Sequence, residues 1–145
     1  MKQRKTPLIL LASAVAGLGV FAGANATVGK QQSAPTTVTV TEGSPSTFGL
    51  KASRSVVPAG RVAFKIANAG TITHEVAVIR TSYRADSLPG PRTKVSESGN
   101  VGESGDVAGR GSKTFTVTLK RGHYALICNL TGHYTGGMHI DLTVR

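Results

Sequence analysis

Apolar and polar residues alternate with a repeat of two along much of the chain after Thr36. In the clearest segment, Val62, Phe64 and Ile66 are separated by Ala63 and Lys65. A repeat of two places successive side chains on opposite faces of a strand, so each such segment is predicted to be a half-buried β-strand. The pattern predicts about seven short strands, at residues 36–40, 48–50, 61–67, 73–80, 115–119, 124–128 and 138–144.

Turn residues separate these segments. Val56–Gly60 contains a proline and a glycine, and it is predicted to be a turn that leads into the next strand. In the segment 73–80, His74, Val76 and Val78 are expected to share one face. Strands separated by short turns, with no convincing helix, predict an all-β fold, an antiparallel Greek-key β-sandwich.

Residues 81–111 break the alternation. They contain two prolines, six glycines, several serines and scattered charges. Long connections of this kind either cover part of the domain and face a partner, or they are disordered, and the sequence favours neither. A short helical turn is expected near Ala85-Asp86-Ser87.

Composition agrees with a strand-and-turn fold. The chain has 145 residues, which is enough for one domain with a core, and it contains 18 glycines and no tryptophan. No internal repeat is visible.

The first 35 residues have a different character. Lys2, Arg4 and Lys5 precede an apolar run, residues 7–24, which ends in Ala24-Asn25-Ala26. This order predicts a signal peptide over residues 1–26, followed by a flexible linker at 27–35 and one domain at 36–145. An uncleaved membrane anchor is the alternative. With either outcome the domain is expected outside the cytoplasm, in the periplasm, outside the cell or on the cell envelope.

The chain is strongly basic, with 17 Lys and Arg against 7 Asp and Glu. Loss of residues 1–26 would leave 14 basic and the same 7 acidic residues. Such a charge keeps a protein soluble, and it can also attract an acidic protein or an anionic cell surface. No nucleic-acid-binding motif is visible. Membrane contact is expected only if the N-terminal segment is retained.

Three side chains that can bind a metal lie in one segment, Cys128-Asn-Leu-Thr-Gly-His133-Tyr-Thr-Gly-Gly-Met138, which reads C-x4-H-x4-M. A second histidine, His74, lies on a separate predicted strand. Two imidazoles and a thiolate with a weak thioether suit both Cu(I) and Cu(II), so the set predicts a type 1 copper site. The single cysteine cannot form an internal disulfide, and a metal would occupy its thiol.

Simpler interpretations exist for each of these residues. Cys128 and Met138 could be apolar core residues, and His74 could be a hydrogen-bonded histidine in the core. Zinc is the main other metal, but methionine is a poor zinc ligand. Cysteine-protease chemistry would need a histidine base and an oxyanion hole. His123 is expected to be solvated and His139 to lie on the surface.

The sequence also resembles a known family. Asn68-Ala-Gly-Thr-Ile-Thr-His74 resembles the N-x-G-x-x-x-H segment of cupredoxins, the blue-copper proteins. The run YALICNLTGHYTGGMHIDLTV resembles their C-terminal ligand loop and last strand, with a spacing similar to sulfocyanin- and rusticyanin-like members. The resemblance, from Thr36 to the C-terminus, implies equatorial ligands His74, Cys128 and His133 and the axial ligand Met138.

One residue departs from that pattern. Many cupredoxins have asparagine or serine after the first histidine, where it pins the ligand loop, whereas this chain has Glu75. A carboxylate there can accept hydrogen bonds but cannot donate them.

The combined hypothesis is an exported electron carrier, not an enzyme, that meets redox partner proteins in short-lived contacts. By the same resemblance, the ring edge of His133 would serve as the electron port. Copper buffering or delivery to exported oxidases would use the same ligands and stays an alternative. A structural sandwich without metal is the third hypothesis.

Overall fold

The structure is a computed structural model that describes residues 33–44 and 46–145. The predicted signal peptide and most of the predicted linker lie outside these residues. The described part contains nine strands and no helix, and so it offers no apolar helix of membrane-spanning length. In chain order the strands are β1 (Thr36–Glu42), β2 (Leu50–Ala52), β3 (Val56–Val57), β4 (Gly60–Asn68), β5 (Ala77–Arg80), β6 (Asn100–Glu103), β7 (Ser112–Leu119), β8 (Gly122–Ile127) and β9 (His139–Val144).

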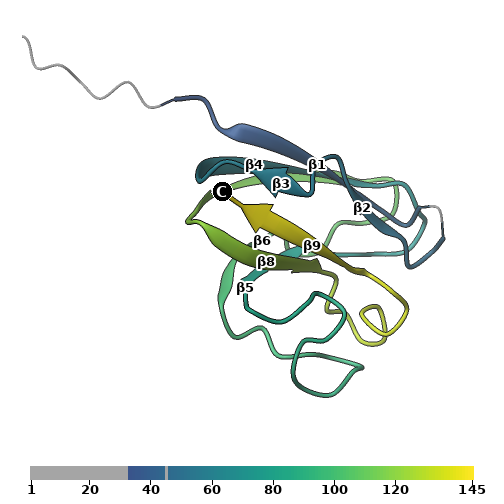
Figure 1. The fold of residues 1–145 in the computed structure, drawn as a ribbon. Helices are drawn as coiled ribbons and strands as arrows, with labels where there is room; N and C mark the ends of the chain where they lie inside the picture. The colour runs from purple at the N-terminus through teal and green to yellow at the C-terminus, as the bar shows by residue number, and fades with distance from the viewer. Residues whose placement is uncertain (1–32, 45) are drawn as a thin grey trace, which may run out of the picture. The chain divides into compact units, whose positions relative to one another are not determined.

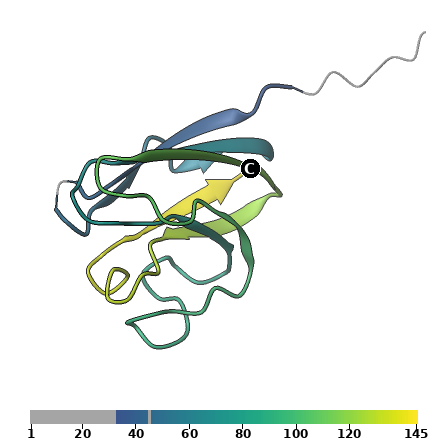
Figure 2. The ribbon, with the colours of Figure 1, turned by 180° about the vertical axis from the view of Figure 1, so that it is seen from behind.

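The strands form two sheets that face each other (Figure 1). The first sheet has the order β2-β1-β4-β7 and the second has the order β3-β9-β8-β5-β6. Figure 2 shows the same two layers from behind, with the chain passing between them several times. The predicted all-β sandwich is confirmed.

The core lies between the two sheets, and it follows from the alternation in the sequence. Every second residue of β1 and β4 turns inward, where it removes apolar surface from water. In the opposite sheet, even-numbered residues of β8 and β9 complete the core. The cluster of buried residues contains Val38, Val40, Val57, Val62, Phe64, Ile66, Val76, Val78, Val107, Leu119, Tyr124, Leu126, Leu142 and Val144.

The expected antiparallel pairing holds for five of the seven strand pairs, and the other two are parallel. β1 pairs with β4 in parallel, with Thr36 opposite Val62, and β3 pairs with β9 in parallel. Parallel neighbours need a crossover connection. The chain makes one between β1 and β4, because β2 turns back along β1 and β3 then joins the other sheet. The segment Val56–Gly60, predicted as a turn, therefore contains the short strand β3.

The predicted strand at 73–80 also needs correction. Regular pairing begins only at Ala77, while His74 makes an isolated bridge to Val107. Ala77 and Ile79 are as buried as Val78, so both faces of this strand are covered.

Residues 81–111 cover the outer face of this strand. They are ordered, and they contain β6 and a turn in which Ser87 N–H donates to Arg84 C=O at 3.0 Å. This segment packs on the outer face of the second sheet, where it forms a second apolar cluster of Ala77, Ile79, Ala85, Leu88, Val95, Ala125, Ile127 and Tyr134. Disorder of this segment is thereby excluded, and its expected covering role is the one observed.

Candidate metal centre

Three of the four predicted ligands lie near the beginning or end of a strand of the second sheet, and His133 lies in the loop between β8 and β9. His74 precedes β5, Cys128 directly follows β8, and Met138 directly precedes β9. Because β8 runs antiparallel to both β5 and β9, these positions meet at one end of the sandwich. We call this the metal end.

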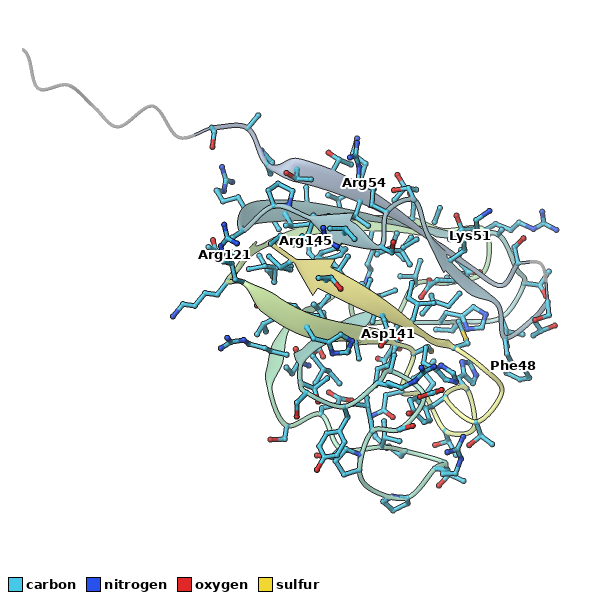
Figure 3. All side chains as sticks on the ribbon, viewed as in Figure 1. Phe48, Lys51, Arg54, Arg121, Asp141 and Arg145 are labelled. Atoms are coloured by element: carbon cyan, nitrogen blue, oxygen red, sulfur yellow. The ribbon has the colours of Figure 1, made fainter. Side chains whose placement is uncertain are left out.

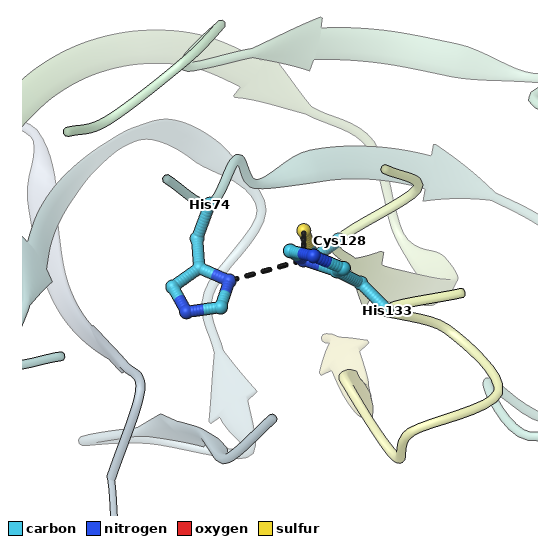
Figure 4. A group of neighbouring side chains, drawn as sticks. All are labelled: His74, Cys128 and His133. Atoms are coloured by element: carbon cyan, nitrogen blue, oxygen red, sulfur yellow. Dashed lines mark hydrogen bonds between the residues drawn. The ribbon is translucent and has the colours of Figure 1, made fainter. Parts of the chain in front are cut away.

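Three of the four side chains converge there (Figure 4). Nδ1 of His74 lies 3.1 Å from Nδ1 of His133, and Sγ of Cys128 lies 3.2 Å from the same atom of His133. One ligand atom from each residue falls within 4.8 Å of the others. The fold thus brings together two histidines that are 59 positions apart in the chain.

His74 is held by its backbone. Its N–H donates to Val107 C=O at 3.1 Å, and its C=O accepts from Val107 N–H at 2.7 Å. Asn68 Nδ2 donates to both Val107 C=O and Ile72 C=O, at 2.9 and 2.7 Å. Its Oδ1 accepts from Gly70 N–H at 2.9 Å. The asparagine of the N-x-G-x-x-x-H segment therefore orients the histidine that follows it.

The loop between β8 and β9 closes on itself. Cys128 N–H donates to Met138 C=O at 3.0 Å, and Met138 N–H donates to His133 C=O at 3.2 Å. Gly132 and Gly137 have φ of +83° and +109°, values that residues with a Cβ rarely adopt. These two glycines let the loop turn tightly enough to bring His133 and Met138 back to Cys128.

Sequence reasoning missed Asn129, which ties this loop to residues 81–111. Its Oδ1 accepts from Val95 N–H, and its Nδ2 donates to Val95 C=O, both at 2.9 Å. Its Nδ2 also lies 2.7 Å from Oε1 of Glu97. Its position next to Cys128 was visible in the sequence, but no pattern there shows which segment an asparagine will meet.

Glu75 acts as the acceptor that its chemistry predicts. Its Oε1 accepts from Asn129 N–H at 3.3 Å, and its own N–H points to Sγ of Cys128 at 3.4 Å. Burial, the larger cause, and the neighbouring acidic residues raise its pKa. The departure from the family pattern thus keeps a link between the two ligand segments, made through an acceptor.

Electrostatics at the metal end disfavour charge when no cation is present. Burial lowers the pKa of His133, and burial together with His133 lowers the pKa of His74. Burial raises the pKa of the Cys128 thiol to about 11. Both imidazoles are thus neutral electron-pair donors, and a bound cation is what would stabilise the thiolate.

A second missed residue is Glu42, on the inward face of β1 with Val38 and Val40. Its side chain is fully buried, and neither carboxyl oxygen has a hydrogen-bond partner among the described residues. Burial, and secondarily Glu75, raise its pKa to about 7. The alternation does predict that position 42 faces inward, so an acidic residue there was the available signal.

The remaining predicted side chains are distributed as follows. Met138 is fully buried, which suits both a ligand and a core residue. His133 is half-buried, and the exposed ring of Phe48 packs edge-on against it with centroids 5.2 Å apart. His139 is half-buried against Tyr134, with ring centroids 5.0 Å apart. His123, predicted to be solvated, keeps 31% of its side chain exposed, and both of its ring nitrogens lie within hydrogen-bonding distance of oxygen atoms.

The donor set fits a soft metal ion. Only one proton can lie between the two Nδ1 atoms, and Nδ1 of His133 also faces the Cys128 thiol. Hydrogen bonds therefore cannot pair all three groups at the same time. Nε2 of His74, the nitrogen that faces away from the cluster, has no hydrogen-bond partner in the described part of the chain. Two imidazoles and one thiol, with a methionine in the same loop, match copper better than zinc.

Comparisons with known proteins found a matching family model and several similar structures. A family model described as the sulfocyanin (SoxE) domain matches residues 28–145. Rusticyanin from Thiobacillus ferrooxidans is similar in structure, with a TM-score of 0.63 and 19% identity over 78% of this chain and 79% of that one. Auracyanin from Roseiflexus castenholzii has a TM-score of 0.52 and 22% identity over 78% of this chain and 99% of that one. No curated protein sequence matches.

Proposed function

The chain belongs to the sulfocyanin (SoxE) domain family and is a cupredoxin, and from this premise we propose that it is an exported carrier of single electrons. The cofactor of cupredoxins is one type 1 copper ion. When bound, this ion supplies the Cu(II)/Cu(I) couple. The residues that would hold this ion are His74, Cys128, His133 and Met138.

The convergence of three donors from two distant segments carries this proposal. The donors are neutral or become anionic on binding, and two of them are fully buried. The hydrogen bonds from Asn68, Asn129 and Met138 hold the ligand segments before any metal arrives. Such pre-organisation limits rearrangement when the charge of the site changes, which is what an electron carrier requires.

The same rigidity favours electron transfer over copper delivery. Delivery requires the ligand loop to open, and here three sets of hydrogen bonds keep it closed. Electron self-exchange measured by NMR, beside copper release to a chelator, separates the two functions. Fast exchange with slow release supports the carrier, and the reverse supports delivery.

His133 is the proposed point of electron exit. It is half-buried, whereas His74 and Cys128 have no exposed surface. Phe48 beside it and Gly136 against Phe48 give an apolar rim. Such a rim suits a small, short-lived contact with a redox partner protein.

A spectroscopic titration tests the site. Cu(II) added to the wild-type chain is expected to give an intense blue thiolate-to-copper band and narrow copper hyperfine splitting in the EPR spectrum. Cys128→Ser should abolish both, whereas His123→Ala, which removes a histidine outside the cluster, should retain both. A missing band in the wild type, or one that survives in Cys128→Ser, contradicts the proposal.

Export is proposed on the basis of the N-terminal pattern. Residues 1–26 would direct the chain out of the cytoplasm, residues 27–35 would form a flexible linker, and residues 36–145 would form the copper-binding domain. N-terminal sequencing of protein from the cell envelope is expected to begin at Thr27. A mature protein that retains Met1 would favour the anchor, and a cytoplasmic location would contradict export.

A further inference from the structure

Four cations lie close together at the end opposite the metal. Arg61 begins β4, Arg80 ends β5, and Lys120 and Arg121 form the turn between β7 and β8. The pairing of Gly60 with Leu119, and of Arg80 with Tyr124, places these termini together. We call these four residues, Arg61, Arg80, Lys120 and Arg121, the basic end. Figure 3 shows Arg121 far from Phe48, which lies at the metal end.

None of the four cations is neutralised. In the described part of the chain, ion pairs join only Arg84 with Asp86 and His123 with Asp141. Glu42 and Glu75 lie at the metal end, and the remaining acidic residues, Glu97, Glu103 and Asp106, lie in the segment around β6. The four cations of the basic end therefore carry positive charge that no carboxylate side chain of the described residues pairs with.

The basic end is also rigid. The Tyr124 hydroxyl donates to Lys120 C=O at 2.8 Å and accepts from Lys120 N–H at 3.1 Å. The Arg80 guanidinium donates to Arg121 C=O at 3.3 Å. Beside it lies a hollow of about 390 Å³, lined by Arg80, Thr81, Ser82, Gly122 and His123. The guanidinium and the hydroxyl groups there are hydrogen-bond donors of the kind that phosphate oxygens accept.

The N-terminal segment joins the domain at this same end. Thr36, the first residue of β1, lies opposite Val62, next to Arg61. Residues 25–35 separate Thr36 from the apolar run at 7–24. Eleven residues span about 40 Å at most, so a bilayer that holds the run is within reach of the basic end.

We propose that the basic end docks on an anionic lipid bilayer, with phosphate headgroups against the four cations and the metal end turned away. The attraction acts whether the N-terminal segment is cleaved or retained. A bilayer is chosen over an acidic protein because it also suits the retained form, in which residues 25–35 connect the apolar run to β1 at this end. The proposal does not depend on copper, and it accounts for an orientation in which His133 stays open to partners.

Lysine footprinting of the full chain tests the proposal. A brief amine-acetylation pulse is applied with vesicles of phosphatidylcholine alone, or of equal parts phosphatidylcholine and phosphatidylglycerol. Acetylation of Lys120 should slow several-fold on the anionic vesicles only, and this protection should fade in high salt. Lys51 and Lys113 should react equally on both. The neutral vesicles measure any insertion of the N-terminal segment alone.

Two matched variants locate the surface. Arg80→Gln with Arg121→Gln removes two charges from the basic end, and it should weaken binding to the anionic vesicles about 25-fold. Lys51→Gln with Arg54→Gln removes two charges elsewhere, and it should retain the protection of Lys120. Equal Lys120 rates on both vesicles, equal loss in both variants, or protection by soluble polyglutamate but not by vesicles would overturn the proposal. The last result would indicate an acidic protein.

Discussion

Two histidine environments share the second sheet and differ in what surrounds the ring nitrogens. At the metal end, Nδ1 of His133 faces another imidazole nitrogen and a sulfur atom. On the outer face, His123 Nδ1 lies 3.0 Å from Thr81 C=O, and its Nε2 lies 2.8 Å from Oδ1 of Asp141. Oxygen atoms face both nitrogens of His123, so hydrogen bonds hold this ring. Electron-pair donors face each other at the metal end, so a metal ion fits.

The same contrast extends to other polar groups. Asp141 accepts a second hydrogen bond from Ala85 N–H at 2.8 Å, which secures the covering segment. At the metal end, Glu42 and Nε2 of His74 are buried without a hydrogen-bond partner in the described residues. Unpaired buried polar groups cost stability. The domain thus gives up stability at the functional end and makes its paired contacts elsewhere.

The largest expected effect is the difference in copper affinity between variants of the two histidines. His133→Ala should lower the affinity for copper by more than about 100-fold, since it removes a ligand and not merely a group that orients one. His123→Ala should leave the affinity within about twofold. Competition with a copper chelator measures both. Equal losses in the two variants would show that the contrast between the two environments has no bearing on metal binding.

The second prediction concerns Glu42 in the metal-free protein. Its pKa rises from 4.5 to about 7 on folding, so the folded state keeps a proton that the unfolded state releases. Its contribution to stability is complete below pH 4.5 and is lost as the pH rises to about 7, a change of about 3 kcal/mol. Glu42→Gln should remove this change.

Urea unfolding at several pH values measures this effect as the difference between wild type and Glu42→Gln. The difference is needed because His74 and His133, with lowered pKa, shift stability in the opposite direction over part of this range. Glu103→Gln, at an exposed site, is the control and should follow the wild type. Parallel curves for wild type and Glu42→Gln would mean that Glu42 ionises freely in the folded protein.

The third prediction concerns the residue that follows His133. The Tyr134 hydroxyl donates to Ala85 C=O at 2.7 Å and accepts from Leu88 N–H at 3.0 Å, both in buried surroundings. Tyr134→Phe leaves these two groups unpaired, and it should lower the free energy of unfolding by about 1–3 kcal/mol. Tyr83→Phe, at an exposed side chain, should have no effect. A urea midpoint that Tyr134→Phe leaves unchanged would show that water replaces the lost bonds.

The smallest expected effect belongs to the His123–Asp141 pair. Its side chains are 31% and 47% exposed, so solvent screens their attraction and a coupling of about 0.5–1 kcal/mol is expected. A double-mutant cycle of His123→Ala and Asp141→Ala measures this coupling. The blue copper band should be the same in all four proteins. A weakened band in the single variants would show that the outer face supports the ligand geometry.

Much of the fold could be predicted from local pattern. The alternation located most core strands because burial of one face requires a repeat of two. It did not show that β1 and β4 are parallel neighbours, since a repeat reports which face a residue occupies and not which strand lies beside it. The alternation also did not decide whether residues 81–111 are ordered. Ala85, Leu88 and Val95 have no regular spacing, and they are buried only by contact with the second sheet.

The sequence by itself determined the kind of site. Cys128, His133 and Met138 lie on one loop, so their chemistry and spacing could be read directly, and the cupredoxin resemblance that they carry is confirmed. Only the tertiary structure decided that His74 meets them, that Glu42 is buried unpaired, and that four cations gather at the opposite end. These facts depend on contacts between residues far apart in the chain, and such contacts are set by strand order and pairing, which local sequence does not specify.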